Sequence, residues 1–136
     1  MANHWTSFFK PPKVKAKKAK ATTTPTVPTE HTEQVKVVNW FRRQYPRVLI
    51  FAVPNGEQRS KITGARLKAE GVTAGVPDLF IPEWRLFIEM KRAKGGTVSP
   101  VQKAMIKELE RVGYAVIIGK GFDDAMEQVK AFASGA

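Results

Sequence analysis

A short apolar run, residues 79–81, and a second run over residues 85–91 in which apolar and charged residues are mixed are separated only by Pro82-Glu83-Trp84. Two such runs that are joined by a turn-forming triplet predict the two strands of a β-hairpin. Because successive side chains of a strand point to opposite faces, the second run presents two different surfaces. The surface that is predicted to face the core carries Leu86, Ile88 and Met90. The opposite surface carries Phe87, Glu89 and Lys91.

The polar surface of this hairpin combines carboxylates with a lysine. Asp78 directly precedes the first run, and the Cα atoms of Glu89 and Lys91 are about 7 Å apart, two strand rises. A divalent cation can activate water and neutralise phosphate charge, and Mg²⁺ is usually held by one or two carboxylates. We therefore predict an Mg²⁺ or Mn²⁺ site formed by Asp78, Glu89 and the backbone carbonyl of Met90. Lys91 is predicted to position or deprotonate an attacking water, or to stabilise a phosphorus centre.

A second interpretation of these residues involves no catalysis. A solvent-exposed hairpin also places Glu89 and Lys91 on one face, where such a pair contributes a few tenths of a kcal/mol. Glu-x-Lys triplets are common by chance. The rest of the chain therefore has to decide between the two interpretations.

Positive charge is concentrated near the N-terminus. The 136 residues have a net charge of +11, and residues 1–29 contain six lysines and no acidic residue. Basic segments bind DNA or RNA by releasing counterions, although a merely solubilising tail has the same composition. Prolines and a threonine-rich run disfavour packed structure there. We expect a basic, disordered tail over residues 1–29 and a folded domain over residues 30–136.

Several classes of protein are excluded by composition. Cysteine is absent, which excludes a disulfide framework, a thiolate zinc site and a cysteine nucleophile. No segment approaches the roughly 18 apolar residues of a membrane span, and residues 1–29 contain no apolar stretch of the length that a secretory signal needs. We therefore expect a cytoplasmic protein with no membrane partner.

The first half of the chain predicts a helix, a strand and a second, shorter helix. The first helix covers about residues 30–45, and its apolar positions recur at helical spacing. These positions are Val35, Val38, Trp40, Phe41 and Tyr45. Residues 48–53 predict a buried strand that ends at Pro54-Asn55-Gly56. The short helix is expected over about residues 60–70.

The second half predicts a helix, a strand and a last helix. Ser99-Pro100-Val101-Gln102 has an N-cap, a proline at the first helical position and a capping-box glutamine. The helix is expected to end before Gly113, with an apolar stripe of Val101, Met105, Ile106, Leu109 and Val112. Residues 114–119 predict a strand, and a helix follows from about residue 122 to 132. This order predicts an α/β fold with a mixed sheet flanked by helices.

Six short segments along the chain carry a further signal: Pro54-Asn55-Gly56, residues 67–72, residues 75–79, Ile88-Glu89-Met90-Lys91, Ser99-Pro100-x-Gln102 and Gly113-Tyr114. Together they resemble the VRR-NUC domain family, which is part of the PD-(D/E)XK nuclease superfamily. The resemblance extends from about residue 30 to residue 132. It implies a restriction-endonuclease-like fold, a mixed β-sheet flanked by helices with an α-β-β-β-α-β core and a C-terminal helix. A small, standalone protein of bacterial or phage type is implied, acting in a bacterial or phage-infected cell.

The resemblance also implies roles for residues outside the hairpin. Glu30 matches a glutamate of the first helix that contributes to the metal site, and Glu33 is the alternative. An acid near a helix N-terminus also interacts favourably with the helix dipole. Gln102 matches a glutamine near the catalytic site, although its capping role explains it without catalysis. Basic residues in segments flanking the site are expected to contact DNA phosphates, although a solvated surface also explains them. They are Arg59, Lys61, Arg66, Lys68, Arg92 and Lys94.

The residues and the resemblance together lead us to expect a metal-dependent DNA endonuclease. Standalone members of the family resemble structure-specific homodimers that use Mg²⁺ or Mn²⁺ to cut branched DNA such as four-way (Holliday) junctions. Two sites related by a two-fold axis can cut both strands of a symmetric branch. The alternatives are a catalytically silent DNA-binding module, a general duplex or flap nuclease, and a restriction-like enzyme with base specificity.

Overall fold

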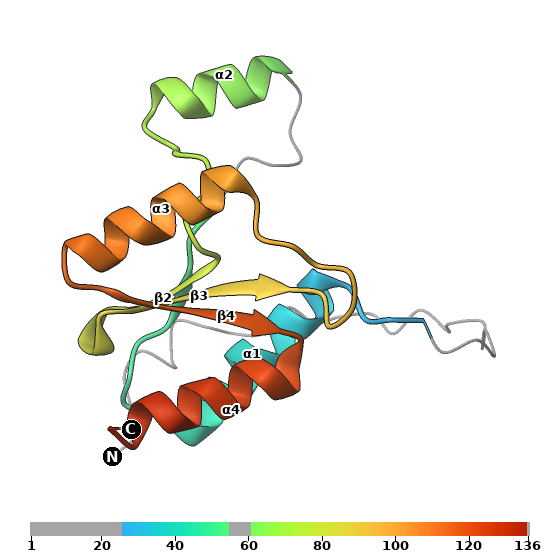
Figure 1. Ribbon diagram of the computed structural model, residues 1–136, viewed down its shortest axis with the longest axis vertical. Coiled ribbons are helices and arrows are strands. Elements are labelled where there is room, and N and C mark those ends of the chain that lie inside the picture. Colours follow the sequence, from blue (N-terminus) through green and yellow to red (C-terminus); the bar gives the residue numbers. More distant parts are fainter. Residues whose placement is uncertain (1–25, 55–60, 136) are drawn as a thin grey trace.

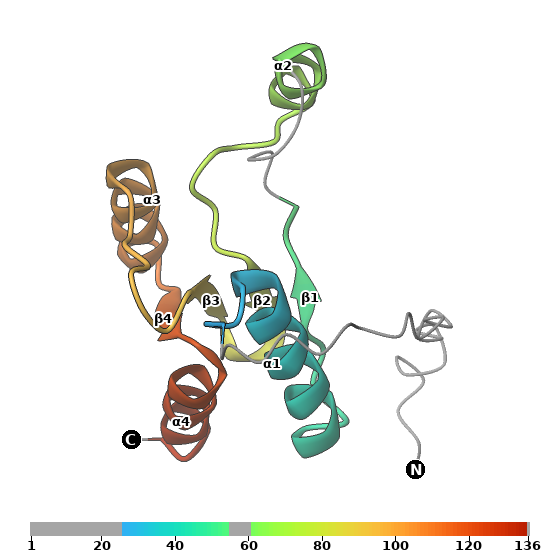
Figure 2. The same ribbon diagram turned by 90° about the vertical axis from the view of Figure 1, so that its right-hand side faces the viewer.

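A four-stranded mixed sheet in the order β1-β2-β3-β4 forms the centre of the computed structural model, which describes residues 26–54 and 61–135 (Figure 1). The strands are β1 (Phe51–Ala52), β2 (Leu79–Ile81), β3 (Leu86–Lys91) and β4 (Ala115–Lys120). β2 pairs antiparallel with β1 and β3, whereas β3 and β4 are parallel. Helices lie on both faces of the sheet (Figure 2). The predicted mixed sheet flanked by helices is therefore confirmed.

The hydrophobic core lies between one face of the sheet and the helices α1 (Glu30–Gln44) and α4 (Phe122–Ala133), which are below the sheet in Figure 1. The strand residues Leu86, Ile88 and Met90 are fully buried there, as their alternation predicted. The helices contribute Val37, Phe41, Ala125 and Val129. Gly119 lets α4 approach β4, because a Cβ atom at this position would lie only 2.5 Å from the Cβ of Ala125.

A 3₁₀ turn, η2 (Pro82–Trp84), joins β2 to β3. Arg85 follows this turn with a left-handed φ of 50°. Because this conformation cannot continue a strand, β3 begins at Leu86 rather than at Arg85 as predicted. The ring of Trp84 lies 5.2 Å from that of Phe41, which anchors the turn to α1.

The opposite face carries α3 (Pro100–Arg111), the crossover that connects the parallel strands β3 and β4. The predicted capping box is present at its start. The Ser99 hydroxyl accepts a hydrogen bond of 3.2 Å from the backbone N–H of Gln102. Gln102 Oε1 in turn accepts one of 3.0 Å from the backbone N–H of Ser99. Both N-terminal donors are thereby satisfied, which fixes where the helix begins.

Three valines that were predicted to be covered are exposed instead. The exposed fractions are 44% for Val35, 54% for Val101 and 46% for Val112. In α1 the buried residues are Glu33, Val37 and Phe41, spaced four apart, so Val35 falls on the solvent side. In α3 only the middle of the predicted stripe is half-buried against the sheet, namely Met105, Ile106 and Leu109.

The strand predicted over residues 48–53 is much shorter than expected. Only Phe51 and Ala52 form β1, which lies at the edge of the sheet. Ile50 is buried, but both residues of β1 are exposed. A run that is apolar on both faces predicts burial on both, whereas here only the core face is covered.

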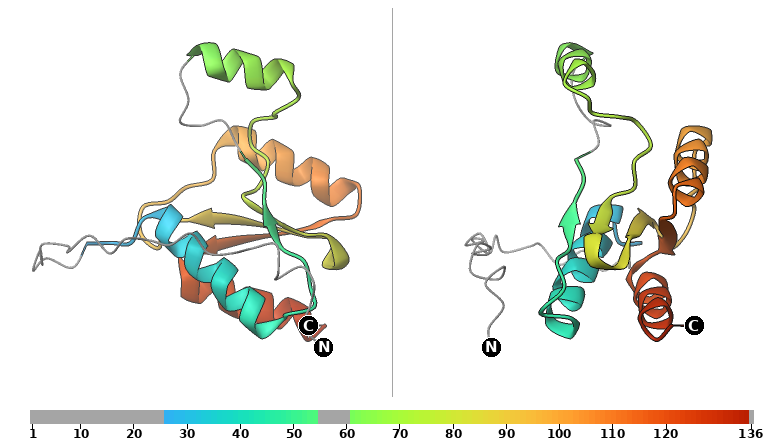
Figure 3. Two further views of the ribbon diagram at one scale, coloured as in Figure 1. Left: turned by 180° about the vertical axis from the view of Figure 1, so that it is seen from behind. Right: turned by 90° about the vertical axis from the view of Figure 1, so that its left-hand side faces the viewer.

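The short helix predicted over about residues 60–70 is α2 (Lys61–Ala69). It stands apart from the sheet in both views of Figure 3. None of its described side chains, residues 64–69, is buried. A nine-residue helix is marginal in water by itself.

Some expectations fall on residues outside this description. Residues 1–25 of the predicted tail, residues 55 and 56 of the predicted turn, and Arg59 lie there. Among the described residues, no helix is long and apolar enough to cross a membrane.

Candidate active site

The ends of two neighbouring strands bring Asp78 and Glu89 together. Asp78 immediately precedes β2, and the pairing of Leu79 with Ile88 places it opposite Glu89 in β3. The Asp78 Oδ2 atom accepts a hydrogen bond of 2.8 Å from the backbone N–H of Met90. This bond fixes the aspartate side chain beside the strand that carries the glutamate and the lysine.

Gly75 allows the loop that leads to Asp78 to pass close to α3. Gly75 has φ of 86°, and a Cβ atom there would lie 2.9 Å from the backbone oxygen of Val101. The loop therefore passes directly against the first turn of α3. This contact brings the loop with Asp78 and the helix with Gln102 together near the carboxylate of Glu89.

Glu89 is at the centre of the site and is only 2% exposed. Its Oε1 atom accepts a hydrogen bond of 2.9 Å from Gln102 Nε2 and lies 3.5 Å from Lys91 Nζ. Within residues 26–54 and 61–135, its Oε2 atom is the buried side-chain oxygen or nitrogen left without a hydrogen-bond partner. An orphaned carboxylate oxygen is costly unless a cation or a proton satisfies it, so this atom fits a metal ligand.

The electrostatic environment of Glu89 also fits a metal ligand. Burial, together with the nearby charges of Asp78 and Glu30, raises the pKa of Glu89 from its ordinary 4.5 to about 8. The ammonium of Lys91 opposes this shift. A divalent cation at the site would favour the ionised form of both strand carboxylates.

The potential ligands are the carboxylates of Asp78 and Glu89 and the backbone carbonyl of Met90. Among the described residues, no three acidic, histidine or cysteine side chains are grouped closely enough to hold one ion. Mg²⁺ does not require three, because water and substrate oxygens complete its coordination. The residues present therefore fit an ion held by two carboxylates.

The two candidate glutamates of α1 have different surroundings. Glu30 is exposed on the first turn, and its charge acts on Glu89. Glu33 is buried, and its Oε2 atom accepts a hydrogen bond from the backbone N–H of Phe122 at the start of α4. Because Gly121 offers no side-chain cap there, Glu33 replaces it. Glu33 is thus occupied in joining the two core helices, which leaves Glu30 as the helix-one acid nearer to the site.

Gln102 makes hydrogen bonds both within the capping box and to Glu89. Its Oε1 completes the capping box, while its Nε2 donates to Glu89. It is 4% exposed, so the cap and the carboxylate are linked through one buried amide. Gln102 is therefore a positioning residue for Glu89.

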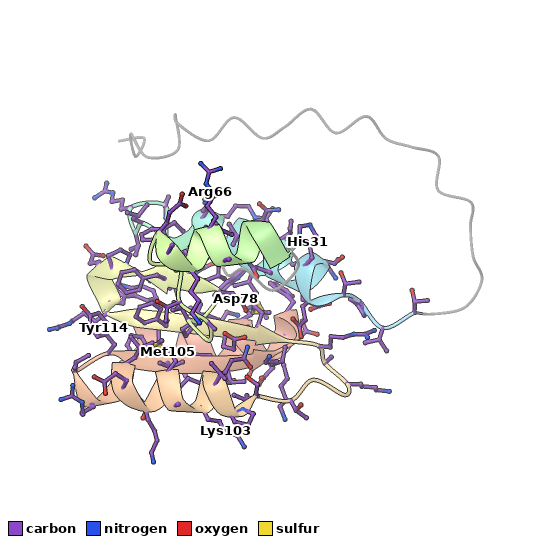
Figure 4. The ribbon with its side chains drawn as sticks, turned by 90° about the horizontal axis from the view of Figure 1, so that it is seen from above. His31, Arg66, Asp78, Lys103, Met105 and Tyr114 are labelled. Carbon is purple, nitrogen blue, oxygen red and sulfur yellow. The ribbon has the colours of Figure 1, made fainter. Side chains whose placement is uncertain are left out.

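The predicted phosphate contacts are spread over two segments. Arg66 and Lys68 are exposed on α2, and Arg66 lies 3.5 Å from Glu70. Arg92 and Lys94 are exposed just after β3, and the Arg92 guanidinium donates to the backbone oxygen of Val27. Lys61 begins α2, but its side chain is outside the description, as is Arg59. In Figure 4 the labelled Arg66 points outward from α2, above Asp78.

Comparison with known proteins supports a nuclease assignment. No protein-family model matches the chain, and no curated protein matches it. Among solved structures, it matches a protein described as a VRR_NUC domain protein, with a TM-score of 0.65 and 29% sequence identity. The match covers 79% of this chain and 90% of that protein.

The fold and the match together define a restriction-endonuclease-like nuclease domain. The resemblance to VRR-NUC domains that was predicted from short motifs is confirmed over most of the chain.

Proposed function

We propose that this protein is an Mg²⁺- or Mn²⁺-dependent endodeoxyribonuclease. The observation that carries this proposal is the buried Glu89 carboxylate, with one oxygen held by Gln102 and Lys91 and the other without a partner. A DNA-binding module that does no chemistry would gain nothing from a buried acid next to a second carboxylate, because both repel phosphate.

Each residue of the site has a defined task in this proposal. Asp78 and Glu89 would hold the cation, with the backbone carbonyl of Met90 as a further ligand and Glu30 acting from the first turn of α1. The cation supplies Lewis acidity and an activated water. Lys91, 8% exposed and on the same strand face as Glu89, positions that water or stabilises the charge on phosphorus. Gln102 fixes the orientation of Glu89.

The proposed substrate is branched DNA, such as a four-way junction, cut by a homodimer. Exposed cations on α2 and after β3 provide phosphate contacts on the side of the site, and the basic tail of residues 1–29 adds affinity to the domain of residues 30–136. Two sites related by a two-fold axis would make paired cuts. We further propose that the protein acts in the cytoplasm of a bacterial or phage-infected cell, as the resemblance to small standalone family members implies.

Cleavage of a labelled four-way junction beside a linear duplex of matched sequence tests this proposal. The reactions contain Mg²⁺ or EDTA, and wild type is compared with Lys91→Ala. Paired cuts in the junction, absent with EDTA and with the variant, are expected. Equal cleavage of both DNAs would indicate a general nuclease, whereas salt-sensitive binding without any cut would indicate a silent binding module.

A further inference from the structure

Four aromatic rings form a continuous surface across the sheet, and none of the proposed catalytic roles uses them. This aromatic surface consists of Phe51, Phe80, Phe87 and Tyr114. The ring centroids of Phe80 and Phe87 are stacked 4.3 Å apart. Phe51 lies 5.6 Å from Phe80, and Tyr114 lies 5.6 Å from Phe87. The rings therefore run from β1, at the sheet edge, to the start of β4.

The aromatic surface lies on the same face of the sheet as the candidate active site. Phe87 precedes Glu89 by two residues in β3, so the two side chains share a face at a Cα separation of about 7 Å. The register pairs Phe80 with Phe87 and Phe51 with Phe80, which puts these rings on that face too. Asp78, Met105 and Tyr114 are all seen from this side in Figure 4.

Three of the four rings are not enclosed as those of a core would be, whereas Phe87 is only 9% exposed. Phe51 is 38% exposed, and Phe80 and Tyr114 are half-buried. α3 lies over the β3–β4 side of this face, while α2 stands away from the β1 side (Figure 2). The exposed part of the aromatic surface is therefore next to the acids, at the edge of the sheet.

Cations accompany these rings. The guanidinium of Arg85 lies 5.1 Å from the centroid of the Tyr114 ring. Arg66 and Lys68 are exposed on α2, on the same side of the sheet. Aromatic rings beside cations are what proteins use to bind single-stranded nucleic acid, because each base has a flat π face and each phosphate a negative charge. An apolar protein partner would have no need of the cations.

We propose that the aromatic surface binds nucleobases that have left the duplex stack beside the scissile phosphate. The proposal rests on the proposed nuclease function and specifies its substrate, which is DNA with unpaired bases at a branch. Bases of an intact duplex are stacked on their neighbours and cannot offer a face to Phe51 or Phe80. Branch points and flaps have such bases available, so the surface would select them without reading their sequence.

Binding of a branched DNA with and without bases at its unpaired positions tests this proposal directly. Two otherwise identical flap DNAs carry either normal or abasic nucleotides at the branch, and fluorescence anisotropy measures their affinity in EDTA, where no cleavage occurs. Wild type is expected to bind the DNA with bases about tenfold more tightly than the abasic DNA. Phe51→Leu, which keeps an apolar side chain but removes the ring, is expected to bind both equally. Phe51→Trp should retain the difference.

The matched control is Val35→Ala, which shortens a side chain of comparable exposure on α1, across the sheet from the aromatic surface. It is expected to behave as wild type. Absence of any difference between the two DNAs in wild type would overturn the proposal. An equal loss of affinity for both DNAs in Phe51→Leu would also overturn it. A change from dimer to monomer in that variant, measured by light scattering, would overturn it as well, because the aromatic surface would then be a subunit interface.

This measurement is independent of cleavage. If wild type cuts no DNA with Mg²⁺ but still discriminates the two flaps, the proposed nuclease function fails while base binding stands. If wild type cuts branched DNA but does not discriminate them, only the proposal for the aromatic surface fails.

Discussion

The two faces of β3 are both buried, but their side chains have different consequences. Leu86, Ile88 and Met90 lie in the core, where removal from water stabilises the fold. On the other face, Glu89 is equally inaccessible to water, yet its carboxylate has an unpartnered oxygen and a raised pKa. The comparison indicates that one face of the strand contributes stability and the other is organised for chemistry at a cost in stability.

The largest effect is expected from Lys91→Ala on the polar face. Because the ammonium acts on the attacking water or on phosphate charge, its loss should lower the cleavage rate by about 10²- to 10⁴-fold. The midpoint of urea unfolding should change little. Lys130→Ala, an exposed lysine on α4, serves as the control and should cleave normally. Normal cleavage by Lys91→Ala would remove this residue from the mechanism.

The opposite outcome is expected from Ile88→Ala on the core face. Truncating this fully buried side chain should lower the free energy of unfolding by about 2–5 kcal/mol. Where the variant is still folded, its cleavage rate should be close to that of wild type. Urea denaturation and cleavage assays on the same preparation distinguish the two effects. An Ile88→Ala variant with wild-type stability but without cleavage would contradict the assignment of stability to the core face and chemistry to the polar face.

The pH dependence of stability gives a third test of the polar face. Because the pKa of Glu89 is raised from 4.5 to about 8, the folded protein retains a proton that the unfolded chain has lost in this range. The stabilisation from this group is complete below about pH 4.5 and is lost as the pH rises through about 8. Urea unfolding in EDTA over this range should show the decline in wild type. Glu89→Gln should not show this decline. Identical pH profiles of stability for the two proteins would mean that Glu89 is not its source.

Divalent cations should compete with the same proton. Mg²⁺ binding requires the ionised carboxylate, so its affinity should increase as the pH approaches about 8. Calorimetric titration at two pH values in this range can measure the change. A pH-independent affinity would mean that Glu89 is not a ligand.

The smallest effects are expected at the start of α3, where Gln102 both caps the helix and contacts Glu89. Ser99→Ala removes only the cap and should cost about 1 kcal/mol, with cleavage retained. Gln102→Ala removes half of the capping box and also the hydrogen bond to Glu89. We expect it to lower both the free energy of unfolding and the cleavage rate. Equal cleavage by the two variants would reduce Gln102 to a capping residue.

Local patterns in the sequence were sufficient for much of the fold. Alternation along residues 86–91 determined which side chains enter the core, and Ser99 with Gln102 determined where α3 begins. Both follow from the geometry of a single element, because side-chain period and capping depend on neighbouring residues alone. The acidic pair and Lys91 were identified for the same reason, since one short hairpin carries them.

Tertiary structure decided which surfaces are covered and which partners meet. The exposure of Val35 and the shortness of β1 depend on where other elements end, which no local pattern contains. Glu33 caps a helix that begins 89 residues later, and Gln102 reaches Glu89 in another element. The aromatic surface likewise exists only because three strands and the residue before β4 align in one register. Contacts between distant segments depend on how the whole chain packs, so they became visible only in the folded structure.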